Sequence, residues 1–226
     1  MKNFKHITRT LFVTCCILMF ASCGSDGKKG GKDEGVIEFE TNAVDKKHPL
    51  SGLIPSTATL KFKGEKFAIE MSTMGVFNTS IIGDSKAKTI SQTVKFLDVK
   101  QACIQNESEV MAENQDYPIK IEETDETKKI IGLKCYKAKV TKLNEPNVKF
   151  DVWYTKDLGM EDCNNLTPYA QLKGVLVDYR IKKLGLEIHF IAKSYSNTQV
   201  ADNTFEIPAS MKIISAEEMA KFINNY

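Results

Sequence analysis

This chain of 226 residues contains few histidines and has almost no net charge. Each of these two features argues against a class of function. After residue 22 the histidines are His48 and His189, and neither has nearby residues in the pattern of a catalytic triad or a metal site. The 31 basic and 29 acidic side chains nearly balance, without the clustered lysines and arginines that nucleic-acid binding needs. We therefore expect no metal, no cofactor, no nucleic-acid partner and no enzymatic activity.

The apolar run near the start is too short to span a membrane. Leu11–Cys23 (LFVTCCILMFASC) follows Lys2, Lys5 and Arg9 and ends in small residues. A spanning helix needs about 20 apolar residues, whereas a basic start, a short apolar run and small residues are typical of a secretory signal. Residues 1–22 are therefore predicted to be a signal peptide that is removed.

Cys23 directly follows Ala21 and Ser22, an arrangement that resembles the lipobox of bacterial lipoproteins. The resemblance implies a diacylated Cys23, bearing palmitate-like chains, that anchors the protein to the outer membrane of the cell envelope; the side that it faces stays open. Residues 24–35 (GSDGKKGGKDEG) are polar and rich in glycine, which predicts a flexible tether with a reach of about 20 Å. The expected organisation is residues 23–35 as acylated cysteine and tether, then residues 36–226 as a single domain.

Three cysteines remain in the expected domain: Cys103, Cys135 and Cys163. An exported protein meets an oxidising compartment, and an odd number of cysteines allows at most one internal disulfide. A Cys135–Cys163 disulfide is one interpretation, and three buried or partly buried thiols are the other.

Alternation of apolar and polar residues predicts that most of the domain is β-strand. Gly64-Glu65, Asn144–Asn147 and Leu184-Gly185 are expected turns. Besides the hairpin around Gly64-Glu65, the predicted strands are Val76–Gly83, Thr89–Phe96, Ile119–Glu123, Lys129–Leu143 with a bulge at Gly132, Val148–Thr155, Val175–Lys182 and Leu186–Ser194.

Two helices are predicted. Val99–Asn114 is expected to be a strand to about Ile104 and then a short helix, and Ser215 with Glu218 forms a capping box for a helix over Ser215–Asn224. Consecutive hairpins indicate a mainly β (α+β) fold with one antiparallel sheet in chain order. About eight to ten strands bury both faces only if the sheet curls. We therefore expect a strongly curved sheet or half-barrel, with the C-terminal helix and the middle helix on its concave side.

The stretch Lys129–Tyr179 resembles the GLPGLI-type family of bacterial secreted and lipid-anchored proteins. It contains KKIIGLKCYKAKV, FDVWYTKDL and TPYAQLKGVLVDY. Residues that match the family's first two motifs are Gly132, Cys135, Lys137, Ala138, Val152, Trp153, Tyr154 and Thr155; Leu172–Leu176 stands at the name-giving motif but lacks its first glycine and its proline. A wider resemblance to lipoprotein-carrier (Lol-like) proteins implies a curved sheet, and the resemblance supplies no catalytic residues.

The most apolar local cluster is formed by Met71, Met74 and Phe77 with Phe67 and Ile69. Methionine adapts to varied apolar ligands, so this cluster is a candidate lining for a concave groove. An ordinary sheet core is the alternative.

Trp153 and Tyr154 either line a ligand cleft or pack in the core. From these patterns we predict a membrane-tethered, non-catalytic lipoprotein that binds an apolar or lipid-like ligand between the concave face and the helices. The cavity is expected to measure several hundred cubic ångströms, within the usual range of roughly 300–1,000 Å³. The alternative function is a protein-interaction module or accessory subunit of an envelope assembly.

Overall fold

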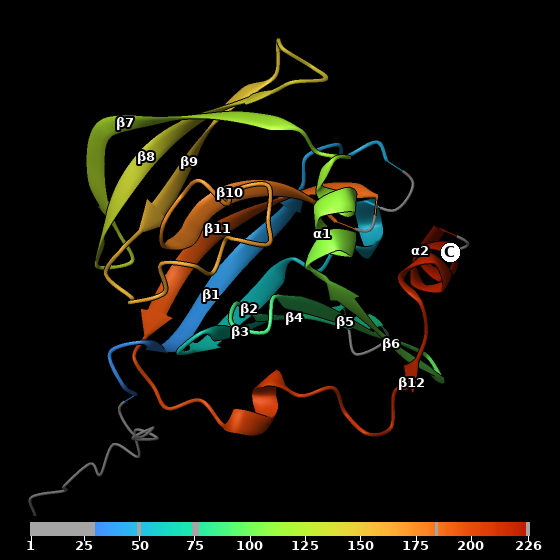
Figure 1. Cartoon of the computed structure of the whole chain (residues 1–226). Coiled ribbons are helices and arrows are strands. Elements are labelled where there is room, and N and C mark those ends of the chain that lie inside the picture. Colours follow the sequence, from blue (N-terminus) through green and yellow to red (C-terminus); the bar gives the residue numbers. More distant parts are fainter. Residues whose placement is uncertain (1–29, 49–50, 74–76, 184, 225–226) are drawn as a thin grey trace, which may run out of the picture.

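A computed structural model describes residues 30–48, 51–73, 77–183 and 185–224. These residues form a mainly β structure, in which one long, curved, open sheet of 12 strands carries two α-helices (Figure 1). Cys23, residues 24–29 of the predicted tether and Met74 lie outside the described residues.

Short turns join most neighbouring strands, and the longest connection is residues 156–174. The strands are β1 Glu34–Ala43, β2 Thr57–Lys63, β3 Lys66–Thr73, β4 Phe77–Asp84, β5 Thr89–Phe96, β6 Val99–Asn106, β7 Ile119–Ile130, β8 Leu133–Lys142, β9 Lys149–Thr155, β10 Val175–Lys183, β11 Leu186–Ser196 and β12 Lys212–Ile213. The helices are α1 Glu107–Asn114 and α2 Ala216–Asn224, with short 3₁₀ turns at Ser51–Leu53 and Asp202–Phe205.

The sheet consists of two antiparallel meanders that meet at β1 and β11. Its order is β12-β6-β5-β4-β3-β2-β1-β11-β10-β9-β8-β7, and Val36 pairs with Ser196 while Ala43 pairs with Ile188. The prediction of a curved antiparallel sheet is confirmed, and pairing follows chain order within each meander. Chain order fails at the β1–β11 pair, and β12 runs parallel to β6.

The concave face of the sheet holds the core because alternate residues of each strand point into it. In β2, for example, Ala58, Leu60 and Phe62 are buried, while Lys61 between them is half-buried on the opposite face. Directly opposed residues on neighbouring strands share this face, as Leu60 does with Ile37 and Ile69.

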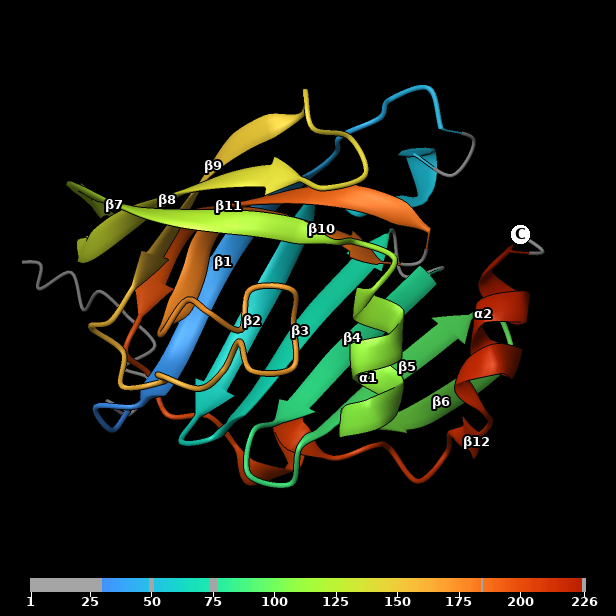
Figure 2. The same ribbon diagram turned by 45° about the horizontal axis from the view of Figure 1, so that its top comes forward.

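Three segments cover the concave face. The two α-helices do so, as expected, and the third is the cover loop, residues 156–174, which joins β9 to β10 without a helix or strand (Figure 2). Helix α1 buries Val110, and α2 buries Met219 against Val94 and Cys103. The predicted capping box of α2 is confirmed, because the Glu218 amide donates to Ser215 Oγ at 3.1 Å and the Ser215 amide donates to Glu218 Oε2 at 2.8 Å.

Two boundaries differ from the sequence prediction. Lys129–Leu143 is not one strand with a bulge, because Ile131 and Gly132, with φ of 47° and 85°, form a two-residue turn between β7 and β8. Positive φ at both positions is the geometry of a type I′ hairpin, which an isoleucine rarely adopts. The second difference is at the start, where Glu34 and Gly35 belong to β1 and not to the predicted tether.

Candidate functional site

An apolar cavity of about 80 Å³ lies between the concave face and its cover. Met160 and Leu166 of the cover loop form its roof, opposite the sheet. The sheet side chains that line it are almost all apolar: Leu60, Phe67, Ile69, Met71, Ile81, Ile90, Val175, Leu176, Tyr179, Ile181 and Phe190. This cavity is therefore a candidate site for an apolar group.

The absence of a side chain at Gly83 shapes one wall of the cavity. Phe67 and Gly83 are directly opposed on β3 and β4. A Cβ at Gly83 would lie 2.2 Å from the Phe67 ring, far inside contact distance. The ring therefore lies flat on the sheet at this position and leaves the cavity open above it.

The roof owes its shape to hydrogen bonds within the cover loop. The Asn164 amide, itself buried, donates to the carbonyl oxygens of Leu172 at 2.9 Å and Gly174 at 2.6 Å. Thr167 Oγ1 donates to the Asn164 carbonyl at 2.9 Å. Side chains of the loop itself make these bonds, and the Tyr169 hydroxyl donates to the Arg180 carbonyl of β10, so the roof has local order and is also tied to the sheet.

Polar contacts at one rim of the cavity join α1 to the sheet and to the roof. Lys183 Nζ lies 2.6 Å from Glu113 Oε1, and Gln105 donates to Glu113 Oε2 at 3.0 Å. Asn114 Nδ2 donates to the Leu166 carbonyl at 3.3 Å. Burial alone would raise the pKa of Glu113, but Lys183 and Gln105 outweigh it and hold that pKa below its usual value. Glu113 is therefore ionised at neutral pH.

A second hollow, of about 250 Å³, opens beyond this rim between α1, α2 and the β10–β11 hairpin. Its lining is more polar than that of the first cavity. The residues around it include Gln92, Cys103, Gln105, Glu113, Asn114, Tyr117, Lys183 and Met219. Asn114 and Lys183 line both spaces.

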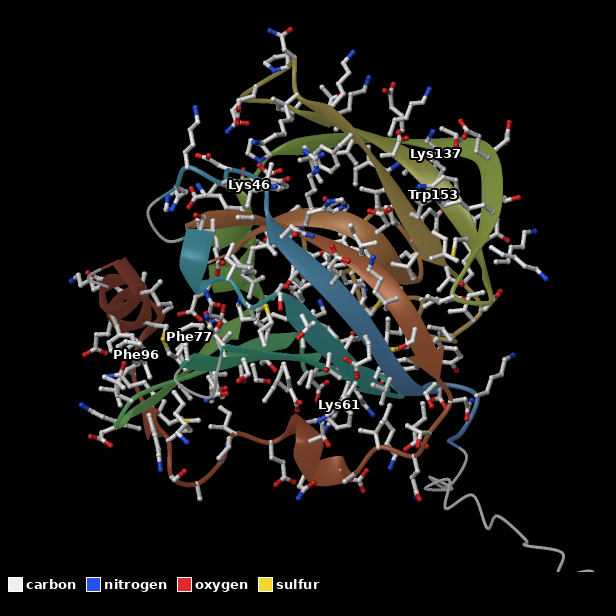
Figure 3. The ribbon with its side chains drawn as sticks, turned by 180° about the vertical axis from the view of Figure 1, so that it is seen from behind. Lys46, Lys61, Phe77, Phe96, Lys137 and Trp153 are labelled. Atoms are coloured by element: carbon white, nitrogen blue, oxygen red, sulfur yellow. The ribbon has the colours of Figure 1, made fainter. Side chains whose placement is uncertain are left out.

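The apolar cluster predicted from the sequence is only partly at the cavity. Phe67, Ile69 and Met71 line it. Phe77 is not among the lining residues, because it packs 6.4 Å from the Phe96 ring in the separate core cluster under α2 (Figure 3). Met74 lies outside the described residues.

Trp153 and Tyr154 point to opposite faces of β9, and neither lines the cavity. Trp153 lies on the outer face, where Lys128 Nζ is 3.9 Å and Lys137 Nζ is 5.9 Å from its ring centre (Figure 3). Tyr154 is buried on the inner face and donates to Glu123 Oε2 at 2.5 Å. The two rings therefore form no common cleft.

The predicted Cys135–Cys163 disulfide is wrong, because Cys103, Cys135 and Cys163 are all free thiols. Cys135 Sγ faces the Leu133 carbonyl at 3.6 Å, and Cys163 Sγ faces the Gly174 carbonyl at 3.3 Å. Burial raises the pKa of Cys163 to about 12, so this thiol is protonated at neutral pH. The alternative of three buried or partly buried thiols describes the structure.

The rim and the roof were not predicted from the sequence. Glu113 and Lys183 are 70 residues apart, and no spacing indicates their contact. The only signal for the roof is that Leu158, Met160 and Leu166 are apolar residues in a segment with no strand or helix pattern.

Within the described ranges, no group of three or more His, Cys, Asp or Glu side chains is arranged to hold a metal ion. The described helices include none with the length and apolar character required to cross a membrane.

No protein-family model matches the chain, and no curated protein matches it. Among solved structures, it is similar to a crystal structure from Vibrio parahaemolyticus named as an outer membrane lipoprotein-sorting protein domain. The match has 9% sequence identity and covers 79% of this chain and 91% of that chain. The TM-score is 0.21, and at that value the likeness carries no argument about this protein.

Proposed function

We propose that this protein is a lipoprotein of the cell envelope, tethered to the outer membrane through Cys23, that holds an apolar or lipid-like ligand without catalysing a reaction. The observation that carries the proposal is the apolar cavity between the sheet and its cover. Protein interiors are close-packed and contain few voids larger than a water molecule. A void with an almost wholly apolar lining favours an apolar occupant over water.

The size of the cavity sets a condition on binding. Its volume of about 80 Å³ is well below the several hundred cubic ångströms expected from the sequence. Ligand pockets usually measure roughly 300–1,000 Å³. At this volume the cavity admits only a small apolar group, and a longer ligand requires the cover to move. The cover loop and the short helix α1 are suited to this, because segments outside the sheet open at a lower free energy than core strands.

The predicted anchor keeps the cavity near a source of apolar ligands. Cys23 and Gly30, the first described residue, are seven residues apart, and such a stretch spans at most about 25 Å when fully extended. Two acyl chains give lasting attachment, whereas one is marginal. A domain held this close to a bilayer meets membrane-derived apolar molecules more often than any dissolved in bulk solvent.

Native mass spectrometry of the mature protein from its own host tests the proposal. We expect an apolar molecule to co-purify with it, and we expect Ile81→Trp, which fills the cavity, to abolish that mass shift. Ile104→Trp is the matched control, because Ile104 of β6 is 51% exposed and does not line the cavity. The proposal fails if the wild-type protein carries no ligand and binds no N-phenyl-1-naphthylamine, or if Ile81→Trp binds that probe as well as the control does.

The long edge strand β7 favours a second function, a protein-interaction module. β7 has 12 residues and ends the sheet, so its outer edge is unpaired within the described sheet. Such an edge accepts a strand from another chain, although charged residues such as Lys128 and Lys129 oppose this. A photo-crosslinker in place of the exposed Thr127 distinguishes the outcomes. A defined adduct in membranes supports a partner, and recovery of the uncrosslinked monomer alone argues against one.

A further inference from the structure

The concave face changes from apolar to polar along a row of directly opposed residues. The row crosses β2 to β6 through Leu60, Ile69, Ile81, Gln92 and Cys103. Its first three residues line the apolar cavity, and its last two line the second hollow. The change occurs between Ile81 on β4 and Gln92 on β5.

A parallel row shows the same change one strand further on. Ile90 on β5 lines the apolar cavity, and its directly opposed neighbour Gln105 on β6 lines the second hollow. Opposed residues have Cβ atoms about 4.5–5.5 Å apart. The two spaces are therefore adjacent on one sheet face, and Asn114 and Lys183 stand between them because they line both.

The polar groups of the hollow carry little net charge. Lys183 and Glu113 form an ion pair at 2.6 Å, and the side chain of Lys183 is only 17% exposed. At the outer wall, Lys182 and Asp116 again have opposite signs. The remaining polar groups named above are mainly amides, which bind uncharged donors and acceptors.

Gln92 provides a hydrogen-bond donor that the described protein does not use. Its Nε2 atom is buried and has no hydrogen-bond partner among the described residues. A buried donor without a partner is costly, so an acceptor that reached it would gain more than the same contact at an exposed site. Gln92 lies at the boundary where the apolar cavity ends.

We propose that the ligand is an amphiphile with an uncharged hydrogen-bonding head, such as a hydroxyl, ester or amide group. Its apolar chain occupies the cavity, enlarged by movement of the cover, and its head lies in the hollow, where rotation of the Gln92 side chain exposes the buried amide to it. This inference rests on the proposed function and adds the class of head group. A carboxylate or phosphate head finds Lys183 already paired with Glu113, and a plain hydrocarbon leaves the Gln92 donor unpaired.

Competition against N-phenyl-1-naphthylamine tests the head group. The mature chain is used with Cys23→Ser so that it stays in solution, and the competitors are 1-monodecanoylglycerol, decanoate and decane. We expect the monoglyceride to bind about tenfold more tightly than decanoate or decane, the factor that one buried hydrogen bond supplies. Gln92→Leu is expected to remove this preference while the protein still binds the fluorescent probe.

Gln101→Leu is the matched control, because Gln101 lies on the same face of the sheet but lines neither space. It is expected to retain the tenfold preference. Equal binding of the three competitors, or a preference that survives Gln92→Leu in a protein with an unchanged thermal unfolding midpoint, overturns the inference alone. Failure of the wild-type protein to bind the fluorescent probe overturns both this inference and the proposed function.

Discussion

Replacement of Gly83 by alanine is expected to push the Phe67 ring into the cavity. The new Cβ would lie 2.2 and 2.3 Å from two ring carbons, whereas ordinary contacts are 3.4–4 Å, so the ring must move by more than 1 Å. The Cβ projects from the concave face of the sheet, and the displaced ring therefore moves toward the cavity that it lines. One methyl group thus tests both the packing and the site.

The expected loss of stability follows from two opposing effects. Overpacking a closely packed site costs about 1–3 kcal/mol. Alanine loses less conformational entropy on folding than glycine, which returns about 0.5–1 kcal/mol. The net destabilisation of Gly83→Ala is therefore about 0–2.5 kcal/mol, with weaker binding of N-phenyl-1-naphthylamine.

Urea unfolding of a double-mutant cycle with Phe67→Leu measures the effect directly. A leucine has no ring at the contact, so Gly83→Ala in that background is expected to stabilise slightly, and the coupling equals the overpacking cost of about 1–3 kcal/mol. Gly52→Ala is the control, because a Cβ there meets nothing within 4 Å. The reasoning is refuted if Gly83→Ala costs the same with and without the Phe67 ring.

Three further predictions follow from charges and thiols. Lys142→Met is expected to lower the free energy of unfolding in urea by about 3 kcal/mol, because it leaves the 14%-exposed Glu187 without the cation that lies 3.0 Å away. Lys193→Met, which breaks an exposed ion pair, is the control and should cost under about 1 kcal/mol; equal costs contradict the prediction. Cys163 is expected to resist iodoacetamide at pH 8 in the folded protein because its pKa is about 12, and rapid native alkylation argues against its burial. The folded-state pKa of Glu113 is lowered from 4.5, so its contribution to stability is present above that pH and is lost as pH falls through the folded value. Glu113→Gln should therefore lose less stability than the wild type between pH 7 and pH 3, and an identical loss contradicts the assignment.

The strands were predictable where short-range patterns determine them. Thr89–Phe96 matches β5, and the turn at Gly64-Glu65 separates β2 from β3 as expected, with Gly64 at a φ of 57°. Alternation and turn residues act within a few positions, so they are visible in the sequence. The Ile131–Gly132 turn was missed because its conformation suits Asn-Gly and contradicts the preference of isoleucine.

The site was less predictable than the strands. Met71 and Ile69 are visible as an apolar cluster, but their role as cavity lining depends on Met160 and Leu166, which come from a distant loop. Phe77 has the same sequence character as Phe67 yet packs under α2 instead. Local pattern shows which face a residue occupies, and only the tertiary fold shows what covers that face.

The pairing of β1 with β11 sets the order in which this protein can fold. Glu38 of β1 is paired with Thr59 of β2 and with Ser194 of β11. The ribosome adds Ser194 to the chain long after Thr59. Until residues 186–196 are available, β1 has one open edge, and the two meanders cannot share a core. Such long-range pairing is slow. The β1–β11 pairing, which fixes the compact shape of the sheet, therefore cannot form before β11 has been made.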